Sequence, residues 1–238
     1  VDVERRGRVA VLTLRRPERQ NRIDAAMALE ATRFLEAARG DPGIGACVVT
    51  GHGDVFCLGG DYQSSGPTTA GRIAYADAFT ALHGAMAGLG KPLVVAVNGD
   101  AHAGGFSVVV ACDLAVCATD ATLGLPEAAA GFFPYLALAA VRDALPKKLL
   151  FDLVYGARLL GADEAREHHL VNVVVPRAEV LDRAVALAEA AAGHDPAILM
   201  LGRDLWHAMS GLEPKAAFEQ ARFAFLAAMA ARDATGTR

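Results

Sequence analysis

Two pairs of adjacent glycines and one glutamate are the residues of this 238-residue sequence best suited to chemistry. Gly59–Gly60 ends the short apolar segment 55–58, and Gly104–Gly105 stands between the apolar run 93–98 and an apolar segment of helical length. Glycines at the start of a helix let the backbone approach a ligand, and the first helical N–H groups point at that ligand. Glu127 lies in a long apolar stretch, where burial would raise its pKa and suit it to proton transfer near neutral pH.

Each of these features also has a purely structural explanation. A strand–Gly–Gly–helix junction is often only a tight turn with close packing. Glu127 follows Pro126, and an acidic residue in the first helical turn after a proline is favourable whether or not it does chemistry. The chemical interpretation therefore depends on the two glycine turns and the glutamate meeting in one place.

The order of apolar runs predicts an α/β fold. In the first half of the chain, short runs with the length of buried strands alternate with segments of helical periodicity, which gives parallel strand–helix–strand units. We expect an α/β core over residues 1–190 and a helical C-terminal region over 191–238. The expected strands are 9–14, 45–50, 93–98, 113–118, 123–125 and 171–175, and the expected helices are 22–40, 70–89, 104–112, 136–145, 147–155, 162–168, 178–192 and 197–231, the last with a break near 211–214.

This arrangement would bring the two glycine turns together. Parallel strands deliver their carboxyl ends to one edge of a sheet, so both turns are expected to face the same crevice. The backbone N–H groups of Leu58 and Gly104 would then converge on one carbonyl oxygen. One such donor, aimed at developing negative charge, stabilises a transition state by about 3 kcal/mol.

Composition excludes some classes of partner. The chain has 23 Lys and Arg against 27 Asp and Glu, a net charge of −4, which argues against nucleic acid as the main partner. No apolar run reaches membrane-spanning length, and the start of the chain lacks the order of a signal peptide, so we expect a cytoplasmic protein without a membrane partner. Hydrophobic residues make up 53% of the chain, and such a surplus of apolar surface favours an oligomer.

The four cysteines do not predict a metal site. Cys47, Cys57, Cys112 and Cys117 lie in apolar stretches without the Cys-x-x-Cys spacing or the neighbouring histidines of zinc sites. We interpret them as reduced core residues and expect no metal.

Six segments of the sequence resemble, in order and spacing, the motifs of the crotonase (enoyl-CoA hydratase/isomerase) superfamily. This resemblance covers nearly the whole chain and implies a crotonase-like spiral β/α core, a homotrimer or homohexamer, and acyl thioester substrates. It implies no separate cofactor, because coenzyme A or phosphopantetheine enters as part of the substrate, and an acyl carrier protein is then a conceivable partner. The segments are RPERQN (16–21), FCLGGD (56–61), NGDAHAGG (98–105), CDL (112–114), PE (126–127) and GADEA (161–165).

The resemblance also implies roles for individual residues. By that correspondence Leu58 and Gly104 supply the oxyanion-hole N–H groups, and Glu127 falls on one of the two catalytic glutamates of the hydratases. The other glutamate position holds Ser107, which cannot transfer protons in the same way. Hydration usually shares its proton transfers between two carboxylates, whereas moving a double bond needs one base, so isomerisation gains weight over hydration.

Five further residues are expected near the substrate. Asp61 would supply a second carboxylate or else only stiffen the turn, and Tyr135 would narrow the acyl pocket or else belong to the core. His102 lies between a strand and the glycines, where a structural role competes with a substrate contact. Gly105 and Phe106 follow Gly104 directly and are expected to contact substrate as well.

The function predicted from these residues is isomerisation or hydration/dehydration of an enoyl thioester through an enolate. Several stretches are also similar to the crotonase-type dehydratases and decarboxylases of polyketide β-branching, of which the dehydratases keep a glutamate at the position of Glu127. Thioester decarboxylation with Tyr135 as orienting group is therefore an alternative. A crotonase-fold binding or scaffold protein without activity is another. Family members usually continue past the position of Arg238 with a helix and a basic segment that helps cover the thioester carrier, so an absent tail would affect coenzyme A binding.

Overall fold

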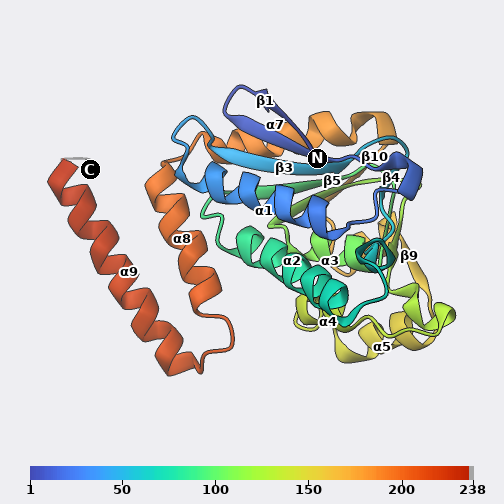
Figure 1. Ribbon diagram of the computed structural model, residues 1–238. Helices are drawn as coiled ribbons and strands as arrows, with labels where there is room; N and C mark the ends of the chain where they lie inside the picture. Colours follow the sequence, from blue (N-terminus) through green and yellow to red (C-terminus); the bar gives the residue numbers. More distant parts are fainter. Residues whose placement is uncertain (236–238) are drawn as a thin grey trace.

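Two β-sheets form the centre of the structure, a computed structural model that describes residues 1–235 (Figure 1). The large sheet has the strand order β1-β2-β3-β5-β7-β10 and the small sheet the order β4-β6-β8-β9. The strands are β1 (Asp2–Arg6), β2 (Val9–Leu14), β3 (Ala46–Gly51), β4 (Val55–Cys57), β5 (Leu93–Val97), β6 (Asp100–His102), β7 (Leu114–Ala118), β8 (Thr122–Gly124), β9 (Leu159–Gly161) and β10 (Val173–Val175).

Helices follow most of the strands and cover the sheets. Their boundaries agree with the predicted segments to within a few residues, and the predicted break near 211–214 separates α8 from α9. The α-helices are α1 (Ala25–Gly40), α2 (Thr69–Ala87), α3 (Gly104–Ala111), α4 (Tyr135–Val141), α5 (Lys147–Tyr155), α6 (Ala162–Glu167), α7 (Val180–Ala192), α8 (Pro196–Ala208) and α9 (Pro214–Thr235), and the 3₁₀ helices are η1 (Pro17–Arg19), η2 (Tyr62–Ser65), η3 (Pro126–Ala130) and η4 (Arg177–Glu179).

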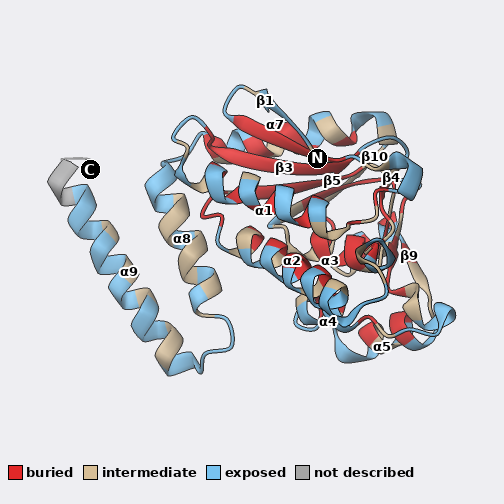
Figure 2. Cartoon of the chain, in the orientation of Figure 1, coloured by how far each residue is buried: buried red, intermediate tan, exposed pale blue. Residues whose placement is uncertain are grey.

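The large sheet confirms the predicted α/β class. β2, β3, β5, β7 and β10 are parallel, and only β1 pairs antiparallel with β2. Every residue of β3 and β5 is buried, as expected of strands that are covered on both faces (Figure 2). α7 packs against β3, β5 and β7. These continuous apolar runs are therefore the centre of the hydrophobic core.

The small sheet arises because the chain leaves the large sheet at Asn98–Gly99. The Asn98 side chain fixes this bend, since its Oδ1 accepts a hydrogen bond from the Gly51 N–H (3.0 Å) and its Nδ2 donates to the Gly53 carbonyl (2.6 Å). After the bend, β6 pairs parallel with β4 and with β8. The sequence predicted one strand running directly into α3, because a strand of three residues carries too little periodicity to be detected.

The C-terminal helices extend away from the sheets (Figure 1). Arg39 and Asp204 (Nη2–Oδ2, 2.6 Å) and Arg203 and Asp113 (Nε–Oδ2, 2.9 Å) tie α8 to the rest of the chain. The last three residues of the expected region 191–238 lie outside the described residues. Within residues 1–235 no single helix is long and apolar enough to cross a membrane, although the pair 177–192 and 196–208, bent by 105°, reaches that length and composition together.

The four cysteines are free, as expected. Cys47, Cys57 and Cys117 are buried, and burial raises the pKa of their thiols. They are therefore neutral core residues, as the sequence indicated.

Candidate active site

A cavity of about 870 Å³ lies at the carboxyl ends of β4, β6 and β8. Gly60 follows β4, Gly104 follows β6 and Glu127 follows β8, and all three line this cavity. Residues of α2 form another part of the wall. The expectation that both glycine turns and the glutamate meet in one crevice is therefore confirmed.

The backbone N–H groups in this cavity differ from those the sequence suggested. The Leu58 N–H donates to the Gln20 carbonyl (3.1 Å) and is not available to a ligand. The N–H groups of Gly60 and Gly104 have no hydrogen-bond acceptor among the described residues. They are neighbours, because a Cβ added to Gly104 would lie 3.4 Å from the Gly60 nitrogen. The expected pair Leu58 and Gly104 is thus corrected to Gly60 and Gly104.

Glycine is required at these two positions by packing. A Cβ on Gly60 would overlap the Tyr75 hydroxyl, and a Cβ on Gly104 would lie 2.9 Å from Cζ of Phe79. Real Cβ atoms do not approach other atoms this closely. α2, which carries both aromatic rings, therefore presses directly against the two free N–H groups.

The turn before α3 contains a strained residue that is not a glycine. Ala103 has φ 55° and ψ −123°, a conformation that L-residues rarely adopt. Gly59, in the other turn, has φ 103°. Gly105 lies within α3 and has no positive φ. Glycine is needed there for packing, because a Cβ would overlap the Cys57 carbonyl. Ala103, a strained residue, is therefore adjacent to the free N–H group of Gly104.

Glu127 has an unusual carboxylate. Its Oε2 is buried and has no hydrogen-bond partner, and the residue lines the cavity. Burial raises its pKa to about 6, although the Glu127 backbone N–H opposes the shift. A carboxyl group with this pKa exchanges protons readily near neutral pH.

His102 also lines the cavity. Its Nε2 lies 2.8 Å from Oγ1 of Thr122, and the Thr122 hydroxyl in turn donates to Oδ1 of Asp100 (2.7 Å). Burial lowers the pKa of the imidazole, so it is neutral at pH 7. The structure thus places His102 in the cavity wall, with one ring nitrogen fixed.

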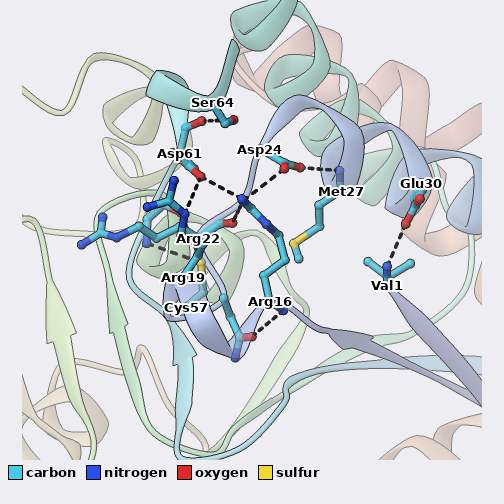
Figure 3. Close-up of polar contacts among 12 residues, drawn as sticks. Val1, Arg16, Arg19, Arg22, Asp24, Met27, Glu30, Cys57, Asp61 and Ser64 are labelled. Carbon is cyan, nitrogen blue, oxygen red and sulfur yellow. Dashed lines mark hydrogen bonds and ion pairs between the residues drawn. The ribbon is translucent and has the colours of Figure 1, made fainter. Parts of the chain in front are cut away.

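Asp61 points toward Arg16 (Figure 3). Its Oδ2 accepts a hydrogen bond from Nη2 of Arg16 (2.9 Å), and Arg16 also pairs with Asp24 (3.2 Å), the N-cap of α1. The Asp61 backbone N–H donates to the Ile23 carbonyl (2.7 Å). Asp61 does not line the cavity. Its contacts fit the structural explanation, in which it holds the Gly59–Gly60 turn against the segment before α1.

Two more of the expected substrate contacts lie in the core. Phe106 is completely buried in the hydrophobic core, and neither Phe106 nor Gly105 lines the cavity. The reason is geometric, since both residues follow Gly104 within α3 and the helix carries them inward. The expectation that they touch substrate is corrected accordingly.

Ser107 is completely buried and contacts another histidine. Its Oγ lies 2.8 Å from the Gly104 carbonyl and 3.1 Å from Nε2 of His83. Nδ1 of His83 lies 3.1 Å from the Phe79 carbonyl. Neither Ser107 nor His83 lines the cavity. The position at which a hydratase would carry its second glutamate therefore presents no proton-transfer group to this cavity.

The outer rim of the cavity is aromatic. The rings of Tyr62 and Phe132 are stacked with centroids 5.7 Å apart, and Tyr135 meets Phe132 edge-on at 5.5 Å. Tyr135 is 67% exposed and lines the cavity, which places it at the opening and not in the core. We call Tyr62, Phe132 and Tyr135 the aromatic rim.

Several lining residues were not singled out from the sequence. Tyr75 and Phe79 are four residues apart on α2, a spacing that puts them on one face, but nothing in the sequence shows that this face meets the glycine turns. Arg22 donates from Nη1 to the Leu58 carbonyl (2.5 Å). Tyr62 and Phe132 come from separate loops, and only the fold brings them together.

The fold and this cavity together define a class of protein. The sequence model of the enoyl-CoA hydratase/isomerase family matches residues 4–234, and the chain therefore belongs to that family. It is 36% identical over 228 residues to a putative enoyl-CoA hydratase of Thermus thermophilus, covering 94% of this chain and 90% of that protein. It is 30% identical over 220 residues to the carnitinyl-CoA dehydratase of Escherichia coli K12, covering 92% and 84%. The structure of human enoyl Coenzyme A hydratase domain-containing protein 3 superimposes with a TM-score of 0.92, covering 98% of this chain and 92% of that one; at 20% identity this likeness shows the crotonase fold alone.

Proposed function

We propose that this enzyme moves protons at C2 of an enoyl thioester through an enolate, in hydration/dehydration or double-bond isomerisation. The observation that carries the proposal is the buried, unpartnered Oε2 of Glu127 in the same cavity as two free N–H groups. An unpaired buried carboxylate is costly, so its retention is best explained by a task that needs it.

The geometry supports a division of labour. The thioester carbonyl oxygen accepts hydrogen bonds from the N–H groups of Gly60 and Gly104, which stabilise it as negative charge develops there. Glu127 takes a proton from C2, and the electron pair of the broken C–H bond moves into the enolate. The same carboxylic acid returns the proton to C2, or to C4 when a double bond is moved. Exclusion of water by the surrounding apolar side chains strengthens both interactions.

The carrier of the acyl group is proposed to be coenzyme A. The relatives reported above are named as CoA-thioester enzymes, which supports this choice. The resemblance to the carrier-protein enzymes of polyketide β-branching concerns the same chemistry, because coenzyme A and carrier proteins share the phosphopantetheine arm. Measuring the exchange of C2 protons in butanoyl-CoA and in butanoyl groups on a carrier protein distinguishes the two carriers.

Exchange of the C2 protons of butanoyl-CoA in D₂O tests the proposed function directly. This reaction needs only the base and the N–H groups, so the enzyme should incorporate deuterium at C2, detected by mass spectrometry. Turnover of 2-enoyl- and 3-enoyl-CoA thioesters then identifies the reaction. Binding of these thioesters without exchange or turnover would favour a scaffold protein, and release of CO₂ from malonyl-CoA would favour a decarboxylase; either result overturns the proposal.

We also propose that the enzyme works as a homotrimer or homohexamer in which α9 packs against another copy. Phe218, Phe223 and Phe225 of α9 are 61–78% exposed in the single chain, and exposed apolar side chains on one element favour an interface. Sedimentation equilibrium should give three or six times the 24.8 kDa chain mass. Replacing Phe223 and Phe225 with serine should lower that mass, and a monomeric wild-type protein would contradict this part of the proposal.

A further inference from the structure

We propose that His102 is a second proton-transfer group in this cavity, whose free Nδ1 takes a proton from the water molecule that adds at C3 of the acyl chain. This inference rests on the proposed function, because it gives Glu127 a partner in the same reaction. It also selects between the two reactions left open above. Hydration and dehydration need a group that serves the C3 oxygen, whereas isomerisation does not.

The hydrogen bonds around Thr122 fix which ring nitrogen of His102 is free. Oγ1 of Thr122 lies 2.7 Å from Oδ1 of Asp100, and a carboxylate oxygen only accepts, so the single hydroxyl proton of Thr122 is donated there. The Thr122 backbone N–H also donates to this oxygen (2.8 Å). Oγ1 must therefore accept from Nε2–H of His102 (2.8 Å). In the neutral ring, the lone pair is then on Nδ1.

Within residues 1–235, Nδ1 of His102 is unpartnered and accessible. It has no hydrogen-bond partner among the described residues, and it is not among the buried side-chain nitrogen and oxygen atoms that lack one. His102 itself lines the cavity. The unprotonated nitrogen is therefore accessible to a ligand in the space that Glu127 also faces.

The surroundings of His102 keep the ring neutral before reaction. Burial has the largest effect and lowers its pKa, nearby Arg22 lowers it further, and Asp100 opposes both. The hydrogen-bond connection of Asp100 to the imidazole runs through Thr122, an arrangement that orients the ring while leaving it able to accept a proton.

The half-buried His83 shows what a purely structural histidine looks like in this fold. Both of its ring nitrogens have partners, the Phe79 carbonyl and the Ser107 hydroxyl, and the residue does not line the cavity. His102 differs in each respect, since one nitrogen is unpartnered and the ring faces the cavity. Ser107 presents no proton-transfer group to the cavity, whereas His102, at the end of β6, presents one.

The proposed step balances without a further reactant. The water oxygen bonds to C3 while one water proton passes to Nδ1 of His102. The π electrons of C2=C3 move into the thioester as the enolate, whose oxygen lies at the N–H groups of Gly60 and Gly104. C2 then takes the proton held by Glu127, and imidazolium His102 returns its proton to the Glu127 carboxylate through solvent. Dehydration is the reverse sequence.

The test compares two reactions in the same variants. His102→Gln keeps a donor for Thr122 but removes the basic Nδ1, and hydration of crotonyl-CoA should fall about 100-fold. Deuterium exchange at C2 of butanoyl-CoA, which needs no C3 group, should stay within threefold of wild type. Thr122→Val removes the orienting hydroxyl and should lower hydration by about tenfold with exchange again retained. His52→Gln is the matched control, because His52 is exposed in the turn after β3 and lies outside the cavity.

The outcomes separate this inference from the proposed function. Hydration by His102→Gln within threefold of wild type overturns the role of His102, as does an equal loss of hydration and exchange, which would indicate a structural role. The role of His102 is also overturned if the wild-type enzyme exchanges C2 protons but hydrates neither a four-carbon nor a ten-carbon 2-enoyl-CoA. A wild-type enzyme that does neither refutes the proposed function itself.

Discussion

The inner and outer walls of the cavity are built in different ways. The inner wall consists of Gly60, Gly104 and Glu127 at the ends of three adjacent parallel strands, where strand pairing fixes the backbone. The outer wall is the aromatic rim, whose side chains come from the loops around η2, η3 and α4 and are 44–67% exposed. From this difference we propose that the inner wall carries the chemistry and that the rim selects the acyl groups that enter.

Replacement of Glu127 with Gln should have the largest effect on the inner wall. The amide cannot take a proton from C2, so exchange into butanoyl-CoA should fall about 10³-fold. In the wild-type enzyme the exchange rate should rise with pH through about 6, because only the ionised carboxylate of Glu127 is a base and its pKa is raised to about 6. A variant that kept the wild-type rate would remove Glu127 from the mechanism.

The same substitution should not destabilise the fold. The pKa of Glu127 is raised by folding from 4.5 to about 6, so its ionisation lowers stability as pH rises through this window, and the cost remains at pH 7. Gln carries no such charge. Thermal unfolding at pH 7 should therefore give a melting temperature at or above that of wild type, which ensures that lost activity reports chemistry.

Gly104→Ala should have the second largest effect. The added Cβ would lie 2.9 Å from the Phe79 ring and 3.4 Å from the Gly60 nitrogen, so it displaces the ring and crowds the other N–H group. Alanine keeps its own N–H, but displacement of the Gly60 N–H would remove one oxyanion donor, a loss that costs about 10²-fold in rate. The double variant Gly104→Ala, Phe79→Leu makes room for the methyl group and serves as the control. Full recovery of exchange in it would mean that ring displacement, and not the N–H groups, caused the loss.

These inner-wall residues show how far the sequence could predict the site. The apolar runs and their order predicted the parallel strands, and the glycine turns and Glu127 were located because their residue types are unusual beside apolar runs. The prediction of Leu58 is wrong because the hydrogen bonding of a single N–H depends on a distant segment, here the Gln20 carbonyl. No local pattern encodes such a pairing.

The same limit applies to Asp61, Phe106 and the aromatic rim. Whether a side chain faces a cavity depends on helix rotation and on loops that are distant in sequence. Asp61 meets Arg16 across 45 residues, and Tyr62 meets Phe132 across an even longer stretch of the chain. His102 was ambiguous for the same reason, since its Thr122 partner belongs to the next strand of the small sheet.

Phe132→Ala tests the outer wall and should have a smaller effect. It removes the ring that stacks on Tyr62 and meets Tyr135, and such aromatic pairs contribute about 0.5–1.5 kcal/mol each. KM for 2-enoyl-CoA thioesters should change by about 2- to 10-fold while kcat and C2 exchange hold, since the rim does not touch the reacting atoms. Tyr155→Ala, an exposed aromatic residue outside the cavity, is the control. A drop in kcat equal to that of Gly104→Ala would contradict the division between the walls.

Ala103→Gly probes the strain of the inner wall and should have the smallest effect, on stability alone. Ala103 holds φ 55° and ψ −123°, which glycine adopts at little cost, so the substitution should raise the free energy of unfolding by about 1 kcal/mol, or about 3 °C in melting temperature. Gly59→Ala is the opposite experiment. Gly59 has φ 103°, and a Cβ there would lie 2.8 Å from that of Ala103, so it should destabilise the protein. A lower melting temperature for Ala103→Gly would show that the methyl group contributes packing that outweighs its strain, and that the inner wall is held by side chains as much as by its strand ends.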